Sequence, residues 1–445
     1  MSKTFSIGGI HPHDNKISVN AAIENFPVME RAYISMSQHL GAPAEPVVVK
    51  GDKVKTGQLI ARANGFISAN VHSSVSGIVN SVEMLPDLAG NLVQHIVINV
   101  EGDEWVESID RTPEIKRDIT HSPQDIIAKI AECGIVGLGG AAFPTHIKLS
   151  PPPGKKAEFL LVNGAECEPY LTSDYRIMLE NSEEILIGVK LMMAALGVKK
   201  AYVGIEENKP KAIKKMKDIA SKGYQNIKIV SLKKRYPQGG EKQLIDAIVG
   251  RQVPSMGLPI DVGVVVQNVG TALAVYEAVQ KNKPLFEGVV TVTGKCMPEQ
   301  RNFRMRVGTT FESMIFAVGG FPKDAEKLVS GGPMMGKAVS RIEAASVKST
   351  SALLLLTEEE TKRGEEANCI RCAKCVDACP MGLEPYLLNR LSRANRMEDL
   401  EANMVHDCIE CGSCLYVCPA DIPLLDTIRL SKAKVLKIIR SRPKK

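Results

Sequence analysis

Short apolar runs alternate with longer amphipathic stretches between residues 159 and 280. The runs are rich in β-branched residues, as buried strands are, and the longer stretches have helical spacing. The strand-like runs are 159–162, 201–205, 226–231 and 262–267, and the helical stretches are 183–196, 210–220, 241–249 and 272–280. This alternation predicts a largely parallel sheet with helices on both faces. Because such sheets bind ligands at the carboxyl ends of strands, the loops after Val162, Ser231 and Gln267 are candidate binding loops.

Residues 46–100 consist of short β segments that turn residues separate. Gly51-Asp52, Gly57 and Gly77 stand between runs of β-branched residues. This pattern resembles the barrel-sandwich hybrid of biotinyl and lipoyl domains, which carry their cofactor on a lysine. No lysine occurs between Lys55 and Lys116, so a carrier function is excluded and we expect a docking or structural module.

A glycine-rich loop follows a helix with clear end signals. Ser122 can cap this helix, Pro123 suits its first turn, and Gly134 ends it. The next residues, 137–142, match G-x-G-x-x-A. A dinucleotide-binding fingerprint must follow a strand rather than a helix, so the match is weak. We interpret the segment instead as a loop whose backbone N–H groups can approach a phosphate.

Residues 288–340 change in character again. They predict strands over 289–293 and 304–307, a short helix over 311–318 and a glycine turn over 330–336. We interpret this part as a small β-grasp module. Residues 341–365 are expected to connect it to the C-terminal part of the chain.

Eight cysteines near the C-terminus form two copies of one motif, CxxCxxCxxxCP. The first copy contains Cys369, Cys372, Cys375 and Cys379, and the second contains Cys408, Cys411, Cys414 and Cys418. In two-cluster ferredoxins the fourth cysteine of each motif binds the other cluster. We therefore assign one [4Fe–4S] cluster to Cys369, Cys372, Cys375 and Cys418, and the second to Cys408, Cys411, Cys414 and Cys379.

Other uses of these cysteines fit less well. Zinc ribbons use paired CxxC knuckles and do not need a fourth Cys-Pro in both copies. Disulfide frameworks belong to short secreted chains. Outside the motifs, we interpret Cys133 and Cys296 as buried structural residues, and the carboxylates beside Cys167 disfavour a reactive thiolate there.

Length and charge limit the number of domains and the kinds of partner that the chain can have. The 445 residues suffice for about three domains, each with its own core. We expect neither a secretory signal nor a membrane span, and hence a soluble or peripheral protein in a reducing compartment. The net charge is +6, and eight Lys or Arg lie between Arg429 and Lys445 without an acidic residue. This basic tail is either a solvated helix or a surface for anionic lipid or an acidic partner, and nothing favours nucleic acid.

Four loops resemble the flavin- and NADH-binding domain of the complex I 51-kDa subunit family. In order they are Gly137-Leu-Gly-Gly-Ala-Ala-Phe-Pro-Thr145, Val162-Asn-Gly-Ala-Glu-Cys-Glu-Pro169, Tyr236-Pro-Gln-Gly-Gly-Glu241 and Gln267-Asn-Val-Gly-Thr271. Together with the modules on either side, they resemble the C subunits of the Rnf-type ion-translocating ferredoxin:NAD oxidoreductases over the whole length. Three carboxylates of the complex I pattern are missing, because Ala165, Gly240 and Gly270 stand in their places.

The resemblance implies an NAD-dependent oxidoreductase subunit with FMN, NAD(H) and the two clusters. It also implies a peripheral position on the cytoplasmic side of the inner (plasma) membrane. The expected partners are NADH, the other subunits of an Rnf-type complex and, indirectly, ferredoxin. Two alternatives remain: a soluble flavin and iron–sulfur cobalamin reductase, and a ferredoxin-like electron-transfer adaptor without flavin.

The cofactor-binding residues that the resemblance implies fall into four groups. The glycine loop and a lysine suit a phosphate, amides and a hydroxyl suit the flavin, aromatic rings can stack, and carboxylates can accept from ribose or carboxamide. These candidates are Gly137, Gly139, Gly140, Phe143, Lys148, Asn163, Glu166, Glu168, Tyr236, Gly239, Gly240, Glu241, Asn268 and Thr271.

The expected architecture is therefore a multidomain α/β protein with four parts. Residues 1–120 form a barrel-sandwich hybrid module, and residues 121–285 form a parallel α/β domain for FMN and NADH. Residues 286–345 form the β-grasp module. Residues 346–445 form a helical, ferredoxin-like domain with two clusters and the basic tail.

Overall fold

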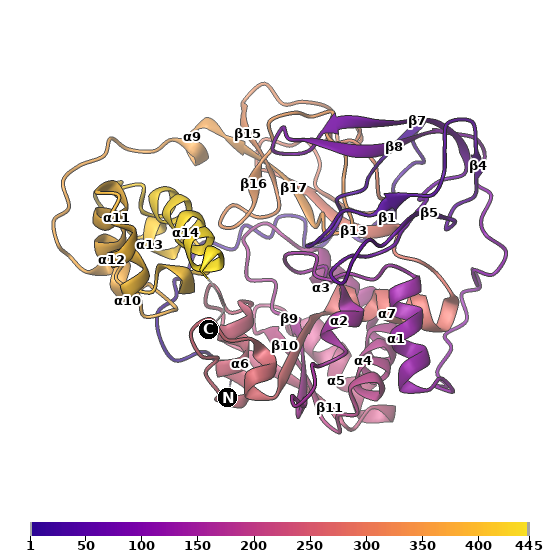
Figure 1. Cartoon of the computed structure of the whole chain (residues 1–445), viewed down its shortest axis with the longest axis horizontal. Coiled ribbons are helices and arrows are strands. Elements are labelled where there is room, and N and C mark those ends of the chain that lie inside the picture. The colour runs from indigo at the N-terminus through magenta and orange to yellow at the C-terminus, as the bar shows by residue number, and fades with distance from the viewer. Residues whose placement is uncertain (1, 443–445) are drawn as a thin grey trace.

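The structure is a computed structural model that describes residues 2–442. Figure 1 shows an α/β part at the bottom, two β-rich parts above it and a helical part on the left that carries the cysteine motifs. The helical part contacts the α/β part, and the chain reaches it through a long loop after helix α9 (Glu358–Thr361).

The α/β part is built on a four-stranded parallel sheet in the order β11-β10-β9-β12. This confirms the expected parallel α/β arrangement. Its strands are β9 (Phe159–Gly164), β10 (Ala201–Glu206), β11 (Ile227–Leu232) and β12 (Val264–Asn268). Its helices are α1 (Pro123–Glu132), α2 (Thr145–Lys148), α3 (Ser173–Glu180), α4 (Ser182–Leu196), α5 (Pro210–Gly223), α6 (Glu241–Val249) and α7 (Val269–Lys281), with a 3₁₀ turn η1 (Pro259–Val262).

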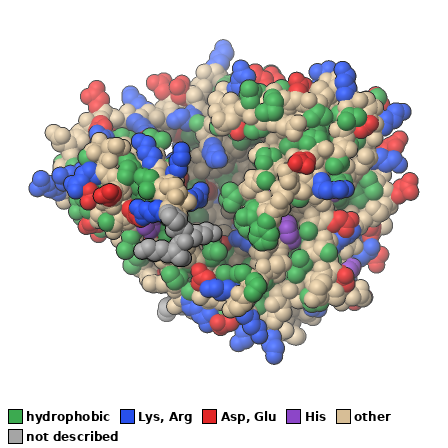
Figure 2. Space-filling model, in the orientation of Figure 1, with side chains coloured by type: hydrophobic (Ala, Val, Ile, Leu, Met, Phe, Trp, Pro, Cys, Tyr) green, Lys and Arg blue, Asp and Glu red, His purple; other side chains and the backbone are tan. Residues whose placement is uncertain are grey.

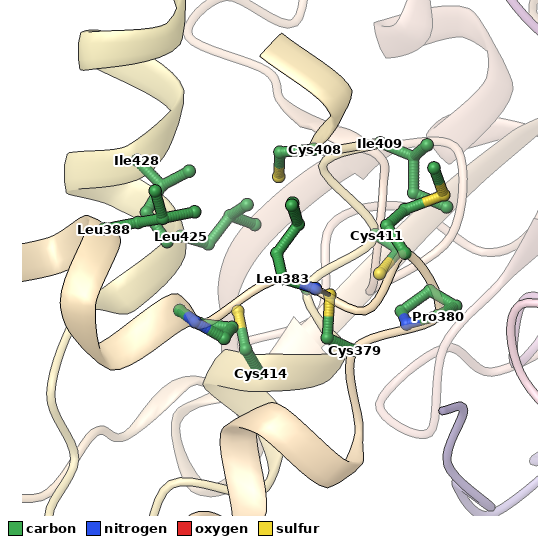
Figure 3. A pocket seen from close by; sticks show the side chains of 13 residues that line it. Cys379, Pro380, Leu383, Leu388, Cys408, Ile409, Cys411, Cys414, Leu425 and Ile428 are labelled. Atoms are coloured by element: carbon green, nitrogen blue, oxygen red, sulfur yellow. Dashed lines mark hydrogen bonds between the residues drawn. The ribbon is translucent and has the colours of Figure 1, made fainter. Parts of the chain in front are cut away.

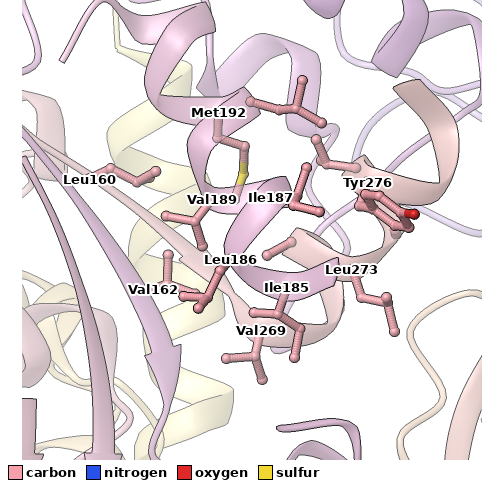
Figure 4. Close-up of a cluster of buried hydrophobic side chains, with 14 of the residues drawn as sticks. Leu160, Val162, Ile185, Leu186, Ile187, Val189, Met192, Val269, Leu273 and Tyr276 are labelled. Atoms are coloured by element: carbon pink, nitrogen blue, oxygen red, sulfur yellow. The ribbon is translucent and has the colours of Figure 1, made fainter. Parts of the chain in front are cut away.

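Both faces of this sheet are buried, because successive strand residues point in opposite directions. Leu160 and Val162 pack into a large core with helices α1, α4, α5 and α7, which Figure 4 shows in part. Leu161 and Val264 pack into a second core on the other face, with helix α6. The uninterrupted apolar runs in the sequence follow from this two-sided burial.

The upper β-rich part contains the residues expected to form a barrel-sandwich hybrid. A four-stranded sheet has the order β2-β8-β7-β4, and a three-stranded sheet has the order β3-β5-β6. Ile34, Ile60 and Ile96 are fully buried in their common core. The strands are β2 (Arg31–Ser35), β3 (Glu45–Pro46), β4 (Lys53–Val54), β5 (Leu59–Arg62), β6 (Val71–His72), β7 (Gly77–Pro86) and β8 (Leu92–Val100).

A mixed six-stranded sheet shifts the expected domain boundaries. Its order is β1-β14-β13-β17-β15-β16, and helix α8 (Phe311–Phe316) packs beside it. The expected connector over 341–365 is wrong, because β17 lies centrally in this sheet and Leu353 to Leu355 are fully buried. The strands are β1 (Ile23–Asn25), β13 (Glu287–Thr293), β14 (Arg301–Arg306), β15 (Ala325–Ser330), β16 (Lys337–Ala338) and β17 (Ala352–Thr357).

The helical part contains both cysteine motifs and most of the basic tail. Its elements are α10 (Lys374–Asp377), α11 (Pro385–Arg393), α12 (Met397–Ala402), η2 (Val405–Asp407), α13 (Ser413–Tyr416) and α14 (Leu424–Ser441). The tail is a packed helix as far as Ser441, since Val435 is buried in the core of this part. Lys444 and Lys445 lie outside the described residues. No helix within residues 2–442 is long and apolar enough to cross a membrane.

Lys348 joins three parts of the molecule. Its backbone N–H donates to the side chain of Gln38, and its buried Nζ donates to the carbonyl oxygens of Asn70 (2.7 Å) and Gly134 (2.8 Å). Gly134 ends helix α1, just before the glycine loop, so Lys348 ties this loop to the β-rich parts. Burial lowers the pKa of Lys348 to about 7.

This pKa predicts how stability depends on pH. Between about pH 7 and the ordinary lysine pKa, the unfolded chain holds a proton at residue 348 that the folded chain does not, so stability increases with pH there. We expect the unfolding temperature of the wild type to rise more between pH 7 and pH 10 than that of Lys348→Met. The exposed Lys156→Met variant serves as control and should behave as the wild type. Equal pH dependence in all three proteins would contradict the prediction.

Candidate electron-transfer site

Four cysteines from both motifs line one cavity. Cys408, Cys411 and Cys414 come from the second motif, and Cys379 comes from the first (Figure 3). Helices α10 and α13 pack against each other, so the cysteine that follows α10 reaches the loop of the other motif. The structure thus brings together the four thiols that the crossed assignment predicts for the second cluster.

The placement of these thiols around one cavity, and not their acidity, suits a cluster of several irons. Burial raises the pKa of Cys408 to about 11, and burial with the thiols of Cys408, Cys411 and Cys379 raises the pKa of Cys414. Among residues 2–442, no three His, Cys, Asp or Glu side chains lie close enough to share one metal ion. The four sulfurs line the wall of the cavity instead, as a cluster with one iron for each thiolate requires.

The other four cysteines lie nearer the surface. Burial and the neighbouring thiol of Cys418 raise the pKa of Cys375, so these two residues from different motifs are close to each other. Cys369 and Cys372 are exposed, in a stretch where every residue from 362 to 374 is exposed. Figure 1 shows this stretch running along the outer side of the helical part.

The two motif loops share one backbone conformation. Arg371 and Glu410 occupy equivalent positions and have φ values of 56° and 57°. Ala373 and Gly412, two residues further on, have φ values of 59° and 77°. Two left-handed residues in each loop turn the chain tightly around the cysteines. The repeat in the sequence is therefore a repeat in structure.

The glycine-rich loop packs on the start of helix α7. The backbone N–H of Leu138 donates to Oγ1 of Thr271 (3.0 Å). A Cβ added to Gly139 would lie 2.8 Å from Nδ2 of Asn268, so only glycine permits this approach. The Asn268 side chain caps α7 by accepting from the N–H of Gly270.

Two further predicted loops meet the glycine loop at the carboxyl edge of the sheet. Nδ2 of Asn163 donates to the carbonyl of Gly239 (2.9 Å), and Nδ2 of Asn268 donates to the carbonyl of Asn163 (3.4 Å). Lys148 forms an ion pair with Glu241 (2.8 Å) on the partly exposed side of this edge. The structure therefore brings together candidate residues from all four loops of the resemblance.

The remaining glycines and Phe143 shape the loop backbone. The N–H of Gly137 donates to the carbonyl of Phe143 (2.9 Å), which closes the loop. Gly140 is exposed, and a Cβ added there would meet no heavy atom within 4 Å. Gly240 precedes helix α6 and lies against the Gln243 side chain.

The carboxylates of Glu166 and Glu168 hold protein backbone. Glu166 accepts from the N–H groups of Asp174 (2.7 Å) and Tyr175 (3.3 Å) at the start of α3. Glu168 accepts from the N–H groups of Met334 (3.1 Å) and Met335 (2.8 Å) in the glycine turn after β15. Burial raises the pKa of both, that of Glu168 to about 7. Glu168 thus joins the α/β part to the turn after β15, whereas Glu166 holds the start of helix α3 within the α/β part.

Tyr236 lies between the α/β part and the cysteines. Its ring is buried in a small apolar cluster with Ile10, Ala378 and Cys411. Its hydroxyl donates to the carbonyl oxygen of Cys411 at 2.8 Å. The residue interpreted as a candidate for flavin stacking therefore contacts the backbone of Cys411, a predicted cluster ligand.

Sequence reasoning missed two residues of this site. Asp174 accepts from Nδ2 of Asn268 (2.8 Å), and burial together with Glu166 raises the pKa of Asp174 to about 7. Asp174 thus supplies a carboxylate near the loops in which this chain lacks three carboxylates of the complex I pattern. Gln238 is fully buried, and both polar atoms of its side chain have no partner among the described residues. A single sequence contains no local signal for either role.

The unpaired amide of Gln238 bears on the fit of a flavin. A buried amide without partners is costly, and it lies in the loop that contacts Asn163 through Gly239. A flavin ring edge or ribityl chain carries donors and acceptors that suit such an amide. The residues present at this edge therefore fit an FMN.

Four family models match consecutive parts of the chain. They are the RnfC barrel sandwich hybrid domain over residues 3–103, the Nuo51 FMN-binding domain over 130–277, the SLBB domain over 289–338 and the 4Fe-4S dicluster domain over 361–419. The chain is thus similar to these families in the order that the sequence predicts.

Curated relatives are similar over most of the chain. The C subunit of the proton-translocating ferredoxin:NAD(+) oxidoreductase complex of Clostridium ljungdahlii is 47% identical over 401 residues, which are 90% of this chain and 86% of the relative. The C subunit of the Na(+)-translocating complex of Acetobacterium woodii is 43% identical and covers 96% of both chains. The C subunit of the ion-translocating oxidoreductase complex of Rhodobacter capsulatus is 41% identical, over 89% of this chain and 76% of its own.

A solved structure aligns more weakly. It is a chain of an NAD+-reducing [NiFe]-hydrogenase in the H2-reduced state, with a TM-score of 0.49 and 18% sequence identity. The alignment covers 73% of this chain and 64% of the other. A likeness of this size adds nothing to the argument.

The predicted crossed ligation of the clusters leads to a test. Cys379→Ala should impair the cluster of Cys408, Cys411 and Cys414, because it removes a thiol from their cavity. Cys418→Ala should impair the other cluster. Iron analysis and EPR spectra of the two variants, recorded anaerobically, distinguish the clusters. The crossed pairing would be refuted if Cys379→Ala impaired the cluster of Cys369, Cys372 and Cys375, and Cys418→Ala impaired the cluster of Cys408, Cys411 and Cys414.

Proposed function

Because this chain belongs to the family of C subunits of the ion-translocating ferredoxin:NAD(+) oxidoreductases, we propose that it passes electrons between NAD(H) and its partner subunits through FMN and two [4Fe–4S] clusters. One observation carries the proposal. The loop of residues 236–241 contacts Asn163 at the candidate flavin site and, through Tyr236, the Cys411 ligand loop. Both candidate sites therefore adjoin one short segment.

The α/β part supplies the residues for FMN and NAD(H). The backbone of residues 137–140 and the ammonium group of Lys148 suit the phosphate, and Asn163, Asn268 and Gln238 offer neutral donors and acceptors to the flavin. Asp174 orients the amide of Asn268 by accepting its hydrogen bond. Bound FMN supplies the conversion between two-electron hydride transfer and single-electron steps, which the protein side chains cannot perform.

The contact between the two sites excludes water. Tyr236, Ile10, Ala378 and Cys411 are buried together, with Met334 against them. Dry, closely packed protein between the sites keeps their separation short and constant, which electron transfer requires. The exposed stretch 362–374, with Cys369 and Cys372, lies on the other side of the helical part and suits exchange with a partner protein.

We place the protein at the cytoplasmic side of the inner membrane as a peripheral subunit, with ferredoxin acting through other subunits. One exposed face of helix α14 supports this placement. Lys434 and Lys437 are exposed there and have no ion pair among the described residues, and Leu430 and Ile438 lie on the same face. Figure 2 shows Lys and Arg side chains over the helical end of the molecule. Basic residues beside exposed apolar ones suit an anionic lipid surface.

Gly139→Val tests the nucleotide site. The valine side chain would collide with Asn268 and push the glycine loop off the sheet edge. We expect at least a tenfold loss in the rate of flavin reduction by NADH, or loss of bound flavin, because the loop would no longer present its N–H groups. Dithionite should still reduce both clusters.

The matched control for this variant is Gly223→Val. Gly223 ends helix α5, and a Cβ added there would meet no heavy atom within 4 Å. The Gly223→Val variant should retain its bound flavin, and NADH should still reduce that flavin. The flavin absorbance, measured under anaerobic conditions, follows its reduction by NADH. If the Gly139→Val variant were reduced at the wild-type rate, the glycine loop would not belong to the nucleotide site.

Charge reversal tests the membrane face. Each basic residue near an anionic surface contributes about 1 kcal/mol, so Lys434→Glu with Lys437→Glu should weaken binding to anionic vesicles at least about thirtyfold in low salt. Lys214→Glu with Lys217→Glu is the control, since these exposed lysines have the same spacing on helix α5. The difference should shrink as salt screens the charges. Equal sedimentation of the two double variants with vesicles would contradict the role of this face.

A further inference from the structure

The repeat allows the two cluster environments to be compared position by position. Arg393 and Lys432 each stand 14 residues after the fourth cysteine of their own motif, Cys379 and Cys418. Both lie on the long helix that follows their motif, α11 for Arg393 and α14 for Lys432. A difference between these two residues is therefore a difference between the two clusters.

Lys432 contacts a cluster ligand loop. Its Nζ donates to the carbonyl oxygen of Cys408 at 2.7 Å and to Oε1 of Glu410 at 2.8 Å. The side chain is only 18% exposed. Arg429 also pairs with Glu410 (2.9 Å), so one positive charge remains uncompensated in this group of three.

Arg393 makes no such contact. It pairs with Glu366 (2.5 Å), and its side chain is 46% exposed. Glu366 lies in the exposed stretch before the first motif. This pair is neutral and solvated, and among residues 2–442 the Arg393 side chain donates to no cysteine carbonyl.

Tyr236 adds a second donor to the same ligand loop. Its hydroxyl donates to the carbonyl of Cys411, and Nε2 of Gln243 donates to the carbonyl of Pro380, next to Cys379. Within residues 2–442, no side chain donates to the backbone carbonyls of the other ligand set, which comprises Cys369, Cys372, Cys375 and Cys418. Among the described residues, the side-chain donors to ligand-loop carbonyls are thus confined to one of the two clusters.

We propose that Lys432 and Tyr236 are positioning residues that raise the reduction potential of the cluster bound by Cys379, Cys408, Cys411 and Cys414. Reduction adds one electron to this cluster and forms no bond, so its negative charge increases by one. Burial opposes that increase, whereas the positive charge on Lys432 and the positive end of the Tyr236 O–H dipole, both held against the backbone of the ligand loop, favour it. The structure places both on this cluster, which adjoins the α/β part.

This inference depends on the proposed function only for the presence of the two clusters. The electron in the test comes from dithionite, so neither flavin nor NADH is needed. Failure of nucleotide binding would therefore leave the result unaffected. Absence of the clusters would instead be seen directly in the iron content.

The test compares Lys432→Met with Arg393→Met in the full-length protein. Anaerobic redox titrations followed by EPR give the midpoint potential of each cluster, and the Cys379→Ala spectrum identifies which signal belongs to which. We expect Lys432→Met to lower the reduction equilibrium constant of the Cys379, Cys408, Cys411 and Cys414 cluster about tenfold, or about 59 mV for one electron. The other cluster should not shift, and Arg393→Met should leave both potentials unchanged.

Tyr236→Phe provides a second, smaller perturbation. It removes only the hydroxyl from a ring that stays packed, so the same cluster should shift in the same direction by a smaller amount. Iron content and unfolding temperature show whether each variant is intact. Unchanged potentials in iron-replete Lys432→Met and Tyr236→Phe would overturn the proposal, and so would an equal shift in Arg393→Met.

Discussion

The hydrogen bond from Tyr236 to the Cys411 carbonyl lies where the nucleotide part and the cluster part meet, and the rest of the molecule is arranged to preserve this contact. Electron transfer needs a short and constant separation, yet the two parts are distant in sequence. The N-terminal segment helps to hold them together. Its Gly9 N–H donates to the carbonyl of Ala378, and Ile10 pairs with Tyr236. Gly8 approaches Cys379 so closely that any side chain there would collide with its backbone.

Buried polar side chains hold the surrounding modules in register. Glu168 joins the carboxyl edge of the parallel sheet to the turn after β15, and Lys348 joins the start of the glycine loop to the β-rich parts. Each is buried and has its hydrogen bonds only in the assembled molecule. Breaking one such joint leaves polar groups unpaired in a dry interior, which costs roughly 1–3 kcal/mol for each group. The modules therefore behave as one unit around the contact.

Local patterns predicted the elements that depend on local physics. Helix α6 begins and ends at the predicted residues, and the crossed grouping of Cys379 with the second motif follows from the repeat alone. Strand β17 was missed because an uninterrupted apolar run has no periodicity that separates a buried strand from a connector. The partners of Glu168 and Tyr236 lie more than 160 residues away, so no local pattern indicates them.

The proposed function requires that electrons from the nucleotide site reach the clusters. Anaerobic titration of the full-length, flavin-loaded protein with NADH shows whether they do, with flavin absorbance and cluster EPR recorded on the same samples. We expect at least one cluster to become reduced as the flavin absorbance falls, and flavin-depleted protein to show no cluster reduction. If NADH reduced the flavin while both clusters stayed oxidised, although dithionite reduces them, electrons would not pass from the flavin to the clusters.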